Sequence, residues 1–97
     1  MSARAKRTVA FTVWGPILRS DMAGLTERVC RLLEQSGAEI ALCEVRDVTV
    51  PDAVTVEALA RLQLAARRNA CRVWLVNASQ ELHDLVAFMG LTDVIPG

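Results

Sequence analysis

The segment Glu39–Val76, EIALCEVRDVTVPDAVTVEALARLQLAARRNACRVWLV, contains the pattern that decides the fold. It begins with a short apolar run, Glu39–Val45, whose length suits a strand buried on both faces. From about Ala53 to Asn69 the apolar residues recur at helical spacing, which predicts a helix. The apolar run Cys71–Val76 again has the length of a strand. A strand, a helix and a strand in this order predict two parallel strands joined by a right-handed crossover.

The residues before this segment continue the same alternation. Thr8–Trp14 is rich in β-branched and aromatic residues and ends at a Gly-Pro pair, which predicts another strand. Ser20 or Asp21 can cap the helix that follows, whose apolar residues fall on one face. We expect Gly37 to end that helix in a left-handed conformation.

The C-terminal residues add a third helix and a short strand. Ser79 can cap this helix, Gly90 ends it, and Asp93–Pro96 is predicted to form a short edge strand. The whole order predicts an α/β fold in a single domain, with a small mixed β-sheet of about four strands and three or more α-helices. We predict that residues 1–7 form a flexible basic tail and that residues 8–97 form the domain.

Composition limits the function classes. The chain has 97 residues and is 53% hydrophobic, which is typical of one small, packed domain. Lys and Arg total 11 and so do Asp and Glu, and this balance argues against a general nucleic-acid-binding protein. The basic start MSARAKR is interpreted as a solubilising tail rather than a tether to a membrane or to nucleic acid.

Location and metal content are predicted from what the sequence lacks. No apolar run approaches the roughly 18 residues that span a bilayer, and no signal-peptide pattern follows the N-terminal charges. Cys30, Cys43 and Cys71 are odd in number, widely spaced and lie in or beside regular elements, which indicates buried or neutral thiols in a reducing cytoplasm and not a disulfide framework. There is no CxxC pair, and the single histidine is His83, so we expect no metal site.

Catalytic patterns are also missing. No glycine-rich loop has a nucleotide-binding spacing, and no serine lies in a nucleophile elbow. Asp47 and Asp52 are loop carboxylates, which are interpreted as turn and cap residues rather than an acid–base pair. His83 and Asp84 are neighbours on a helix and therefore point apart. We expect neither an enzyme nor a cofactor.

Three segments together resemble the STAS domain, the fold of bacterial anti-sigma factor antagonists. VWGPILRSDMAGLTERVCRLL resembles the family's opening strand, its Gly-x-Leu-type turn and its first helix. The segment Glu39–Val76 is similar to the central strand, the switch loop, the second helix and the next strand. NASQELHDLVAFMGLTDVI resembles the closing helix, Gly-Leu pair and short strand. The resemblance runs from about Val9 to Ile95.

The resemblance implies a cytoplasmic, regulatory protein-interaction domain and not a catalyst. In the antagonist branch, a serine of the switch loop is phosphorylated by a kinase-fold partner that is also the anti-sigma factor. The unphosphorylated domain binds that partner and releases the sigma factor. A phosphate adds roughly −1.5 to −2 charges, so in an interface it separates the two proteins by repulsion and desolvation.

The Asp-Ser-Ser-Gly motif of that switch loop falls on Asp52, Ala53, Val54 and Thr55. Val54 takes the place of the phosphorylated serine and has no hydroxyl. A shift of one residue would offer Thr55 as the phosphoacceptor, although the helical pattern turns Thr55 toward the core. Two other interpretations stay open: Asp52 is only a helix cap, or the loop binds a partner constitutively. We favour a domain that binds without the phosphoserine switch.

The second helix carries a candidate partner-binding stripe. Val56, Ala60 and Leu64 lie within about 80° of one another at roughly 100° per residue. Arg61 and further arginines flank them. An exposed apolar stripe with a basic rim is typical of a partner site, although scattered apolar surface residues are also common.

A second branch of the family offers an alternative partner. Some stand-alone STAS domains of about this length resemble this chain and bind the ATPase of a lipid-transport ABC transporter. Their switch loop has threonine directly after the aspartate, where this chain has Ala53, and this counts against the match. The expected partner is a kinase-fold anti-sigma factor, with the transporter ATPase as the alternative. Nucleic-acid binding and direct membrane insertion are not expected.

Overall fold

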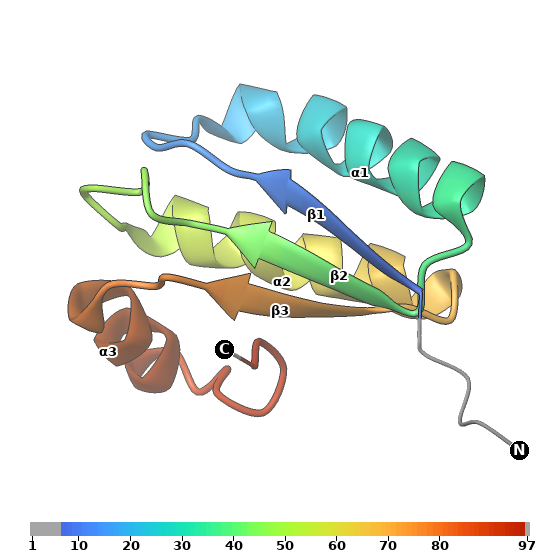
Figure 1. Ribbon diagram of the computed structural model, residues 1–97. Coiled ribbons are helices and arrows are strands. Elements are labelled where there is room, and N and C mark those ends of the chain that lie inside the picture. Colours follow the sequence, from blue (N-terminus) through green and yellow to red (C-terminus); the bar gives the residue numbers. More distant parts are fainter. Residues whose placement is uncertain (1–6, 97) are drawn as a thin grey trace, which may run out of the picture.

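A computed structural model describes residues 7–96 as two layers, in which helices cover one face of a small sheet (Figure 1). Residues 1–6, and with them most of the predicted tail, lie outside the described residues. The elements in chain order are β1 (Thr8–Thr12), η1 (Arg19–Asp21), α1 (Met22–Ser36), β2 (Ile40–Glu44), α2 (Ala53–Arg68), β3 (Arg72–Val76) and α3 (Gln80–Phe88).

The sheet has the order β1-β2-β3, and both strand pairs are parallel. The register places Phe11, Cys43 and Leu75 in one row that faces the helices. Burial raises the pKa of the Cys43 thiol to about 12. Burial also raises the pKa of the Cys71 thiol. The α/β fold in one domain and the buried state of these two cysteines confirm the sequence-based predictions, while Cys30 is only half-buried.

The observed sheet differs from the predicted mixed sheet of about four strands in two respects: all three strands are parallel, and residues 93–96 form a turn and a bend instead of a fourth strand. The backbone N–H groups of Val94 and Ile95 both donate back to the carbonyl of Leu91, at 3.0 and 2.9 Å. They are therefore not available to a neighbouring strand. The segment still lies along β3, where the N–H of Leu75 donates to the carbonyl of Pro96 at 3.0 Å.

Local signals place two of the helix ends as predicted, while the predicted side-chain cap of α1 is absent. Ser79 Oγ accepts from the N–H of Leu82 at 3.1 Å, and Gly37 ends α1 with a φ of 61°. Asp21 stands at the N-terminus of α1 but does not cap it with its side chain. Its carboxylate instead accepts from the N–H of Leu18 at 3.1 Å and holds the turn of η1.

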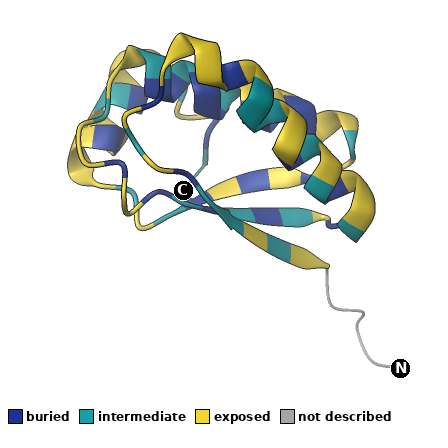
Figure 2. Cartoon of the chain, turned by 90° about the horizontal axis from the view of Figure 1, so that it is seen from above, coloured by how far each residue is buried: buried dark blue, intermediate teal, exposed yellow. Residues whose placement is uncertain are grey.

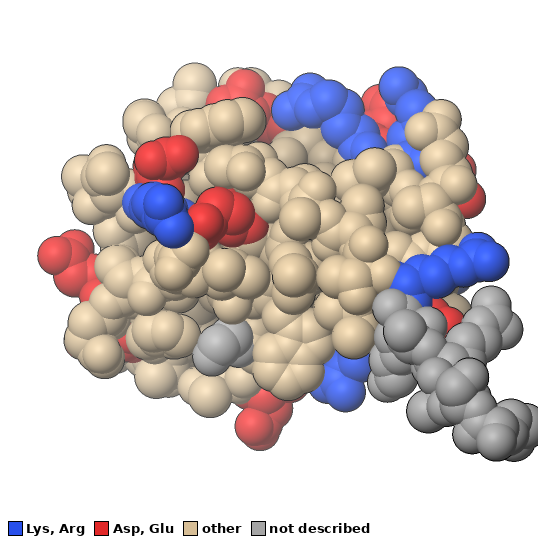
Figure 3. Space-filling model, viewed as in Figure 1, with Lys and Arg blue, Asp and Glu red and all other residues tan. Residues whose placement is uncertain are grey.

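The core lies between the sheet and the helix layer (Figure 2). Each helix inserts fully buried leucines: Leu33 from α1, Leu59 and Leu62 from α2, and Leu82 from α3. The opposite face of the sheet carries no buried side chain in β1–β3, and its centre is uncharged (Figure 3). No helix within residues 7–96 is long and apolar enough to cross a bilayer.

Candidate functional site

The loops after β1 and β2 meet at the C-terminal end of the strands, because parallel strands end on the same side of the sheet. The N–H of Gly15 donates to the carbonyl of Asp47 at 3.4 Å. A Cβ atom at Gly15 would lie 3.5 Å from the Cα of Val48, so the two loops touch. This contact brings the β1–α1 loop beside the loop that leads to Asp52.

Asp52 is the N-cap of α2, as the sequence predicts. Its Oδ1 accepts two hydrogen bonds from Thr55, one from the backbone N–H at 2.8 Å and one from the hydroxyl at 2.9 Å. The backbone hydrogen bond is the largest cause that lowers the pKa of Asp52, and the hydroxyl adds to it. The exposed carboxylate is therefore ionised and committed to holding the first turn of the helix.

The switch-loop positions offer no accessible hydroxyl. Ala53 is exposed and Val54 is half-buried, but neither carries an oxygen on its side chain. Thr55 is 0% exposed, and its hydroxyl donates to Asp52. A kinase must reach the acceptor oxygen from solvent, and the folded domain does not present it.

The exposed face of α2 differs from the predicted stripe at one position. Val56 is 0% exposed and belongs to the core, so it is not available to a partner. The prediction of Val56 as a partner-binding residue is wrong because the helix phase turns it inward and leaves the next residue, Glu57, half-exposed. Ala60 is half-buried, Arg61 is exposed, and Leu64 is 53% exposed.

Arg61 and Leu64 line a hollow of about 440 Å³ between α1 and α2. The α1 wall includes Ala23 and Glu27. Glu57, near the N-terminus of α2, accepts a hydrogen bond from the Arg61 side chain at 3.2 Å. Its second oxygen accepts from Arg19 of η1 at 2.7 Å, and this ion pair links η1 to α2. We call this hollow, which Leu64 lines, the α1–α2 groove.

A comparison with protein families matches the STAS domain over residues 2–97. The chain belongs to the STAS domain family. The family predicted from the sequence is thereby confirmed over essentially the whole chain. STAS domains are commonly regulatory protein-interaction domains and are generally not enzymes. No curated protein matches this sequence.

Further exposed apolar side chains of this STAS domain cluster near the switch loop. Trp14 and Leu18 lie in the β1–α1 loop, and Val50 lies just before the switch loop. Each of them is at least 60% exposed. The sequence does not identify these residues as candidates, because the pattern of Thr8–Trp14 places Trp14 in a strand. The available signal is that Trp14 directly precedes the Gly15-Pro16 pair and Val50 directly precedes Pro51, since Gly and Pro mark turns and loops.

The α1 side of the groove was also missed. Ala23 and Glu27 belong to a helix whose sequence gives no sign of its neighbour, so only the packing of α1 on α2 identifies them. His83 is exposed on α3, away from the switch loop in sequence. Within residues 7–96 no group of three or more acidic, cysteine or histidine side chains is arranged to hold a metal ion.

Proposed function

We propose that this STAS domain is a regulatory binding protein that docks a protein partner constitutively, without a phosphorylation switch. The proposed partner is a kinase-fold anti-sigma factor, and the proposed docking face joins the switch loop to the α1–α2 groove. The observation that carries the proposal is that the Thr55 hydroxyl is fully buried and bonded to Asp52, while the neighbouring Val54 has no hydroxyl. A loop without an accessible acceptor can bind a kinase-fold partner and remain unmodified.

Electrostatics also support binding without the switch. A phosphate on Thr55 would break the hydroxyl bond to Asp52 and would place two like charges at one helix start. The N-terminus of a helix favours one anion, and the Asp52 carboxylate already fills that role. Phosphorylation at this position would therefore work against folding of the first turn of α2.

The α1–α2 groove supports docking because it combines an apolar centre with charged margins. Leu64 is large, apolar and exposed, and Arg61 and Arg68 lie beside it in the groove. Binding sites commonly bury an apolar anchor within a polar rim, and arginine is enriched in them. Of the predicted partner-binding residues, Arg61 and Leu64 line this groove, half-buried Ala60 does not, and Val56 is buried.

Capture of partners from native lysate by wild type and Leu64→Glu, followed by mass spectrometry, tests the docking face. We expect a kinase-fold protein with wild type and its loss with Leu64→Glu, because the substitution removes the exposed apolar anchor and puts a charged, strongly hydrated side chain at the centre of the docking face. Phe88→Glu is the matched control, since Phe88 is 89% exposed on α3. Equal capture by Leu64→Glu and Phe88→Glu would contradict the docking face. Capture of a transporter ATPase instead would favour the alternative partner.

Incubation of the captured pair with ATP, followed by intact-mass measurement, tests the absence of the switch. We expect no added phosphate on the wild-type chain and equal complex formation by Thr55→Val. A phosphate mapped to Thr55 that dissociates the complex would show that the switch operates after all.

A further inference from the structure

The two outer strands of the sheet, β1 and β3, differ in whether their outward backbone groups have hydrogen-bond partners. On the outer edge of β3, Gln63 is bonded to both backbone groups of Val73: its Oε1 accepts from the N–H at 2.8 Å, and its Nε2 donates to the carbonyl at 3.0 Å. Pro96 accepts from the N–H of Leu75. This edge is therefore closed, whereas within residues 7–96 no segment pairs with the outer edge of β1.

The backbone groups at the outer edge of β1 can be assigned from its pairing with β2. The carbonyl of Arg7 accepts from the N–H of Ile40 at 3.1 Å, and the N–H of Val13 donates to Glu44 at 2.9 Å. The odd-numbered residues of β1 thus face β2. By the alternation of a β-ladder, Ala10 and Thr12 point their N–H and C=O groups outward. Figure 2 looks onto this edge, and no other segment crosses in front of β1.

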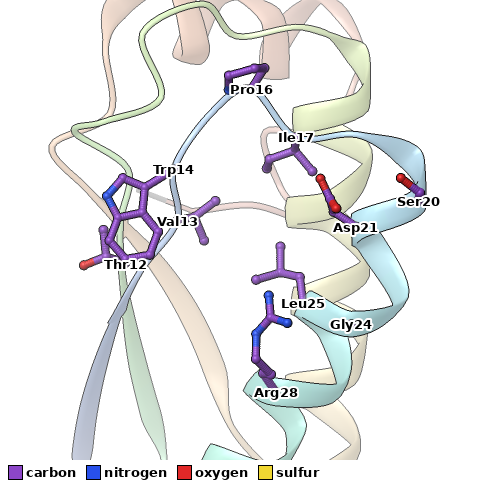
Figure 4. Close-up of a pocket in the computed structure, with 10 residues that line it drawn as sticks. All are labelled: Thr12, Val13, Trp14, Pro16, Ile17, Ser20, Asp21, Gly24, Leu25 and Arg28. Carbon is purple, nitrogen blue, oxygen red and sulfur yellow. The ribbon is translucent and has the colours of Figure 1, made fainter.

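A groove continues from this edge at Thr12. It has a volume of about 420 Å³ and lies between the end of β1 and the start of α1. Figure 4 shows Val13, Ile17 and Leu25 pointing into it, with Arg28 reaching over from the next turn of α1. The groove therefore offers apolar contacts beside unpaired backbone groups, which suits an extended peptide.

The charges of the groove select the kind of peptide. Two charged side chains line it, Asp21 and Arg28. The Asp21 carboxylate already accepts from the N–H of Leu18. The side chain of Arg28 makes no hydrogen bond or ion pair with any residue in the range 7–96. Neither charge has an ion-pair partner among the described residues, but one oxygen of Asp21 is already engaged, whereas the Arg28 guanidinium has free donors that an acidic side chain of a peptide can meet.

We propose that the outer edge of β1 and this groove bind an extended, acidic peptide segment of a protein partner as an added strand. The peptide main chain pairs with Ala10 and Thr12, alternate apolar side chains enter the groove, and a carboxylate meets Arg28. This surface lies on the opposite side of α1 from the α1–α2 groove. The proposal is therefore independent of the docking face proposed above.

A second copy of the chain fits this edge poorly. Antiparallel pairing of two β1 strands would keep both helix layers on the same face of the joined sheet. Because α1 runs beyond the outer edge of β1 (Figure 1), the two α1 helices would then compete for the same space. The chain's own start, MSARAKR, would bring cations rather than an acid to Arg28.

Selection of displayed random linear peptides on the immobilised full chain tests the proposal. We expect enriched peptides that alternate apolar residues and carry Asp or Glu. Fluorescence anisotropy of the synthetic peptides then measures affinity for the variants. Ala10→Pro removes one outward N–H and should weaken binding at least about tenfold. Ala10→Val retains that N–H and is the control, and Arg28→Gln should weaken binding roughly threefold.

Hydrogen exchange of wild type provides a readout that does not depend on how a variant folds. Saturating peptide should slow exchange of the Ala10 and Thr12 amides and leave Val9 and Phe11, which already face β2, unchanged. The proposal is overturned if no peptide is enriched over a blank surface, or if Ala10→Pro and Ala10→Val bind equally. It is also overturned if Leu64→Glu abolishes peptide binding, or if a concentration-dependent dimer protects the two amides instead.

Discussion

At the scale of single residues, Asp52 and Thr55 form one unit. One carboxylate oxygen of Asp52 accepts from both the backbone N–H and the hydroxyl of Thr55, and the threonine side chain is fully buried. The acid of the STAS switch loop is thus retained in a role that needs no phosphate. Of the interpretations left open by the sequence, the structure supports the helix cap directly, while constitutive docking stays a proposal.

Substitution of Asp52 separates the cap from the charge. We expect Asp52→Ala to lower the free energy of unfolding by about 1 kcal/mol, because the first turn loses its acceptor. Asp52→Asn retains an oxygen acceptor and should lose only a few tenths of that amount. Urea denaturation at neutral pH measures both. Equal losses in the two variants would mean that the charge, not the cap, stabilises the turn.

The same pair predicts a pH dependence. The hydrogen bonds from Thr55 lower the pKa of Asp52 below its ordinary value of 3.8 in the folded state. A lowered folded-state pKa means that the ionised carboxylate stabilises the fold above the unfolded-state pKa. This contribution is lost as the pH falls through the folded-state pKa. Wild type should therefore lose stability in acid relative to Asp52→Asn, and a constant difference between the two would contradict the assignment.

At the scale of elements, local patterns were enough to place each helix and the three strands. The caps at Asp52 and Ser79 and the left-handed Gly37 need only neighbouring residues, and for this reason the sequence predicts them. The errors concern contacts between distant segments. Val56 is buried by the packing of α2, and the expected fourth strand is replaced by turns whose contact with Gln63 no local pattern reveals.

Gln63 is the side chain that fastens the C-terminal segment to the sheet. It is 1% exposed, and it bonds to the N–H and C=O of Val73 and donates to the carbonyl of Val94 at 3.0 Å. We expect Gln63→Leu to cost roughly 2–4 kcal/mol of unfolding free energy, because buried backbone groups lose their partners. Urea denaturation checks this value, and exchange of the Leu75 amide should become faster.

The control for this substitution is Gln35→Leu, at an exposed position of α1. It makes the same chemical change without a buried partner and should stay within about 0.5 kcal/mol of wild type. Equal stability of Gln63→Leu and Gln35→Leu would show that water replaces the lost bonds and that Gln63 does not fasten the segment.

At the scale of the molecule, one helix layer on one sheet face leaves the domain with a single core. Small domains bury a limited fraction of their surface, so their net stability is of the order of 5–15 kcal/mol. Both proposed binding surfaces flank α1, one toward α2 and one toward the edge of β1. A partner can therefore bind either surface without opening the core, which fits a domain that acts by binding.

A single core predicts cooperative unfolding, and two leucines on α2 test it. Leu62 is 0% exposed and Leu64 is 53% exposed. Leu62→Ala should lower the free energy of unfolding by about 2–5 kcal/mol, since it leaves a cavity between the layers. Leu64→Ala should change it by less than about 0.5 kcal/mol. Trp74 in β3 and Trp14 in the loop after β1 report by fluorescence on the sheet and its connecting loop, and circular dichroism reports on the helices. Coincident transitions in both variants are expected, because every helix inserts side chains into the same core. A fluorescence change that precedes the loss of helix in Leu62→Ala would mean that the sheet and the helix layer unfold separately.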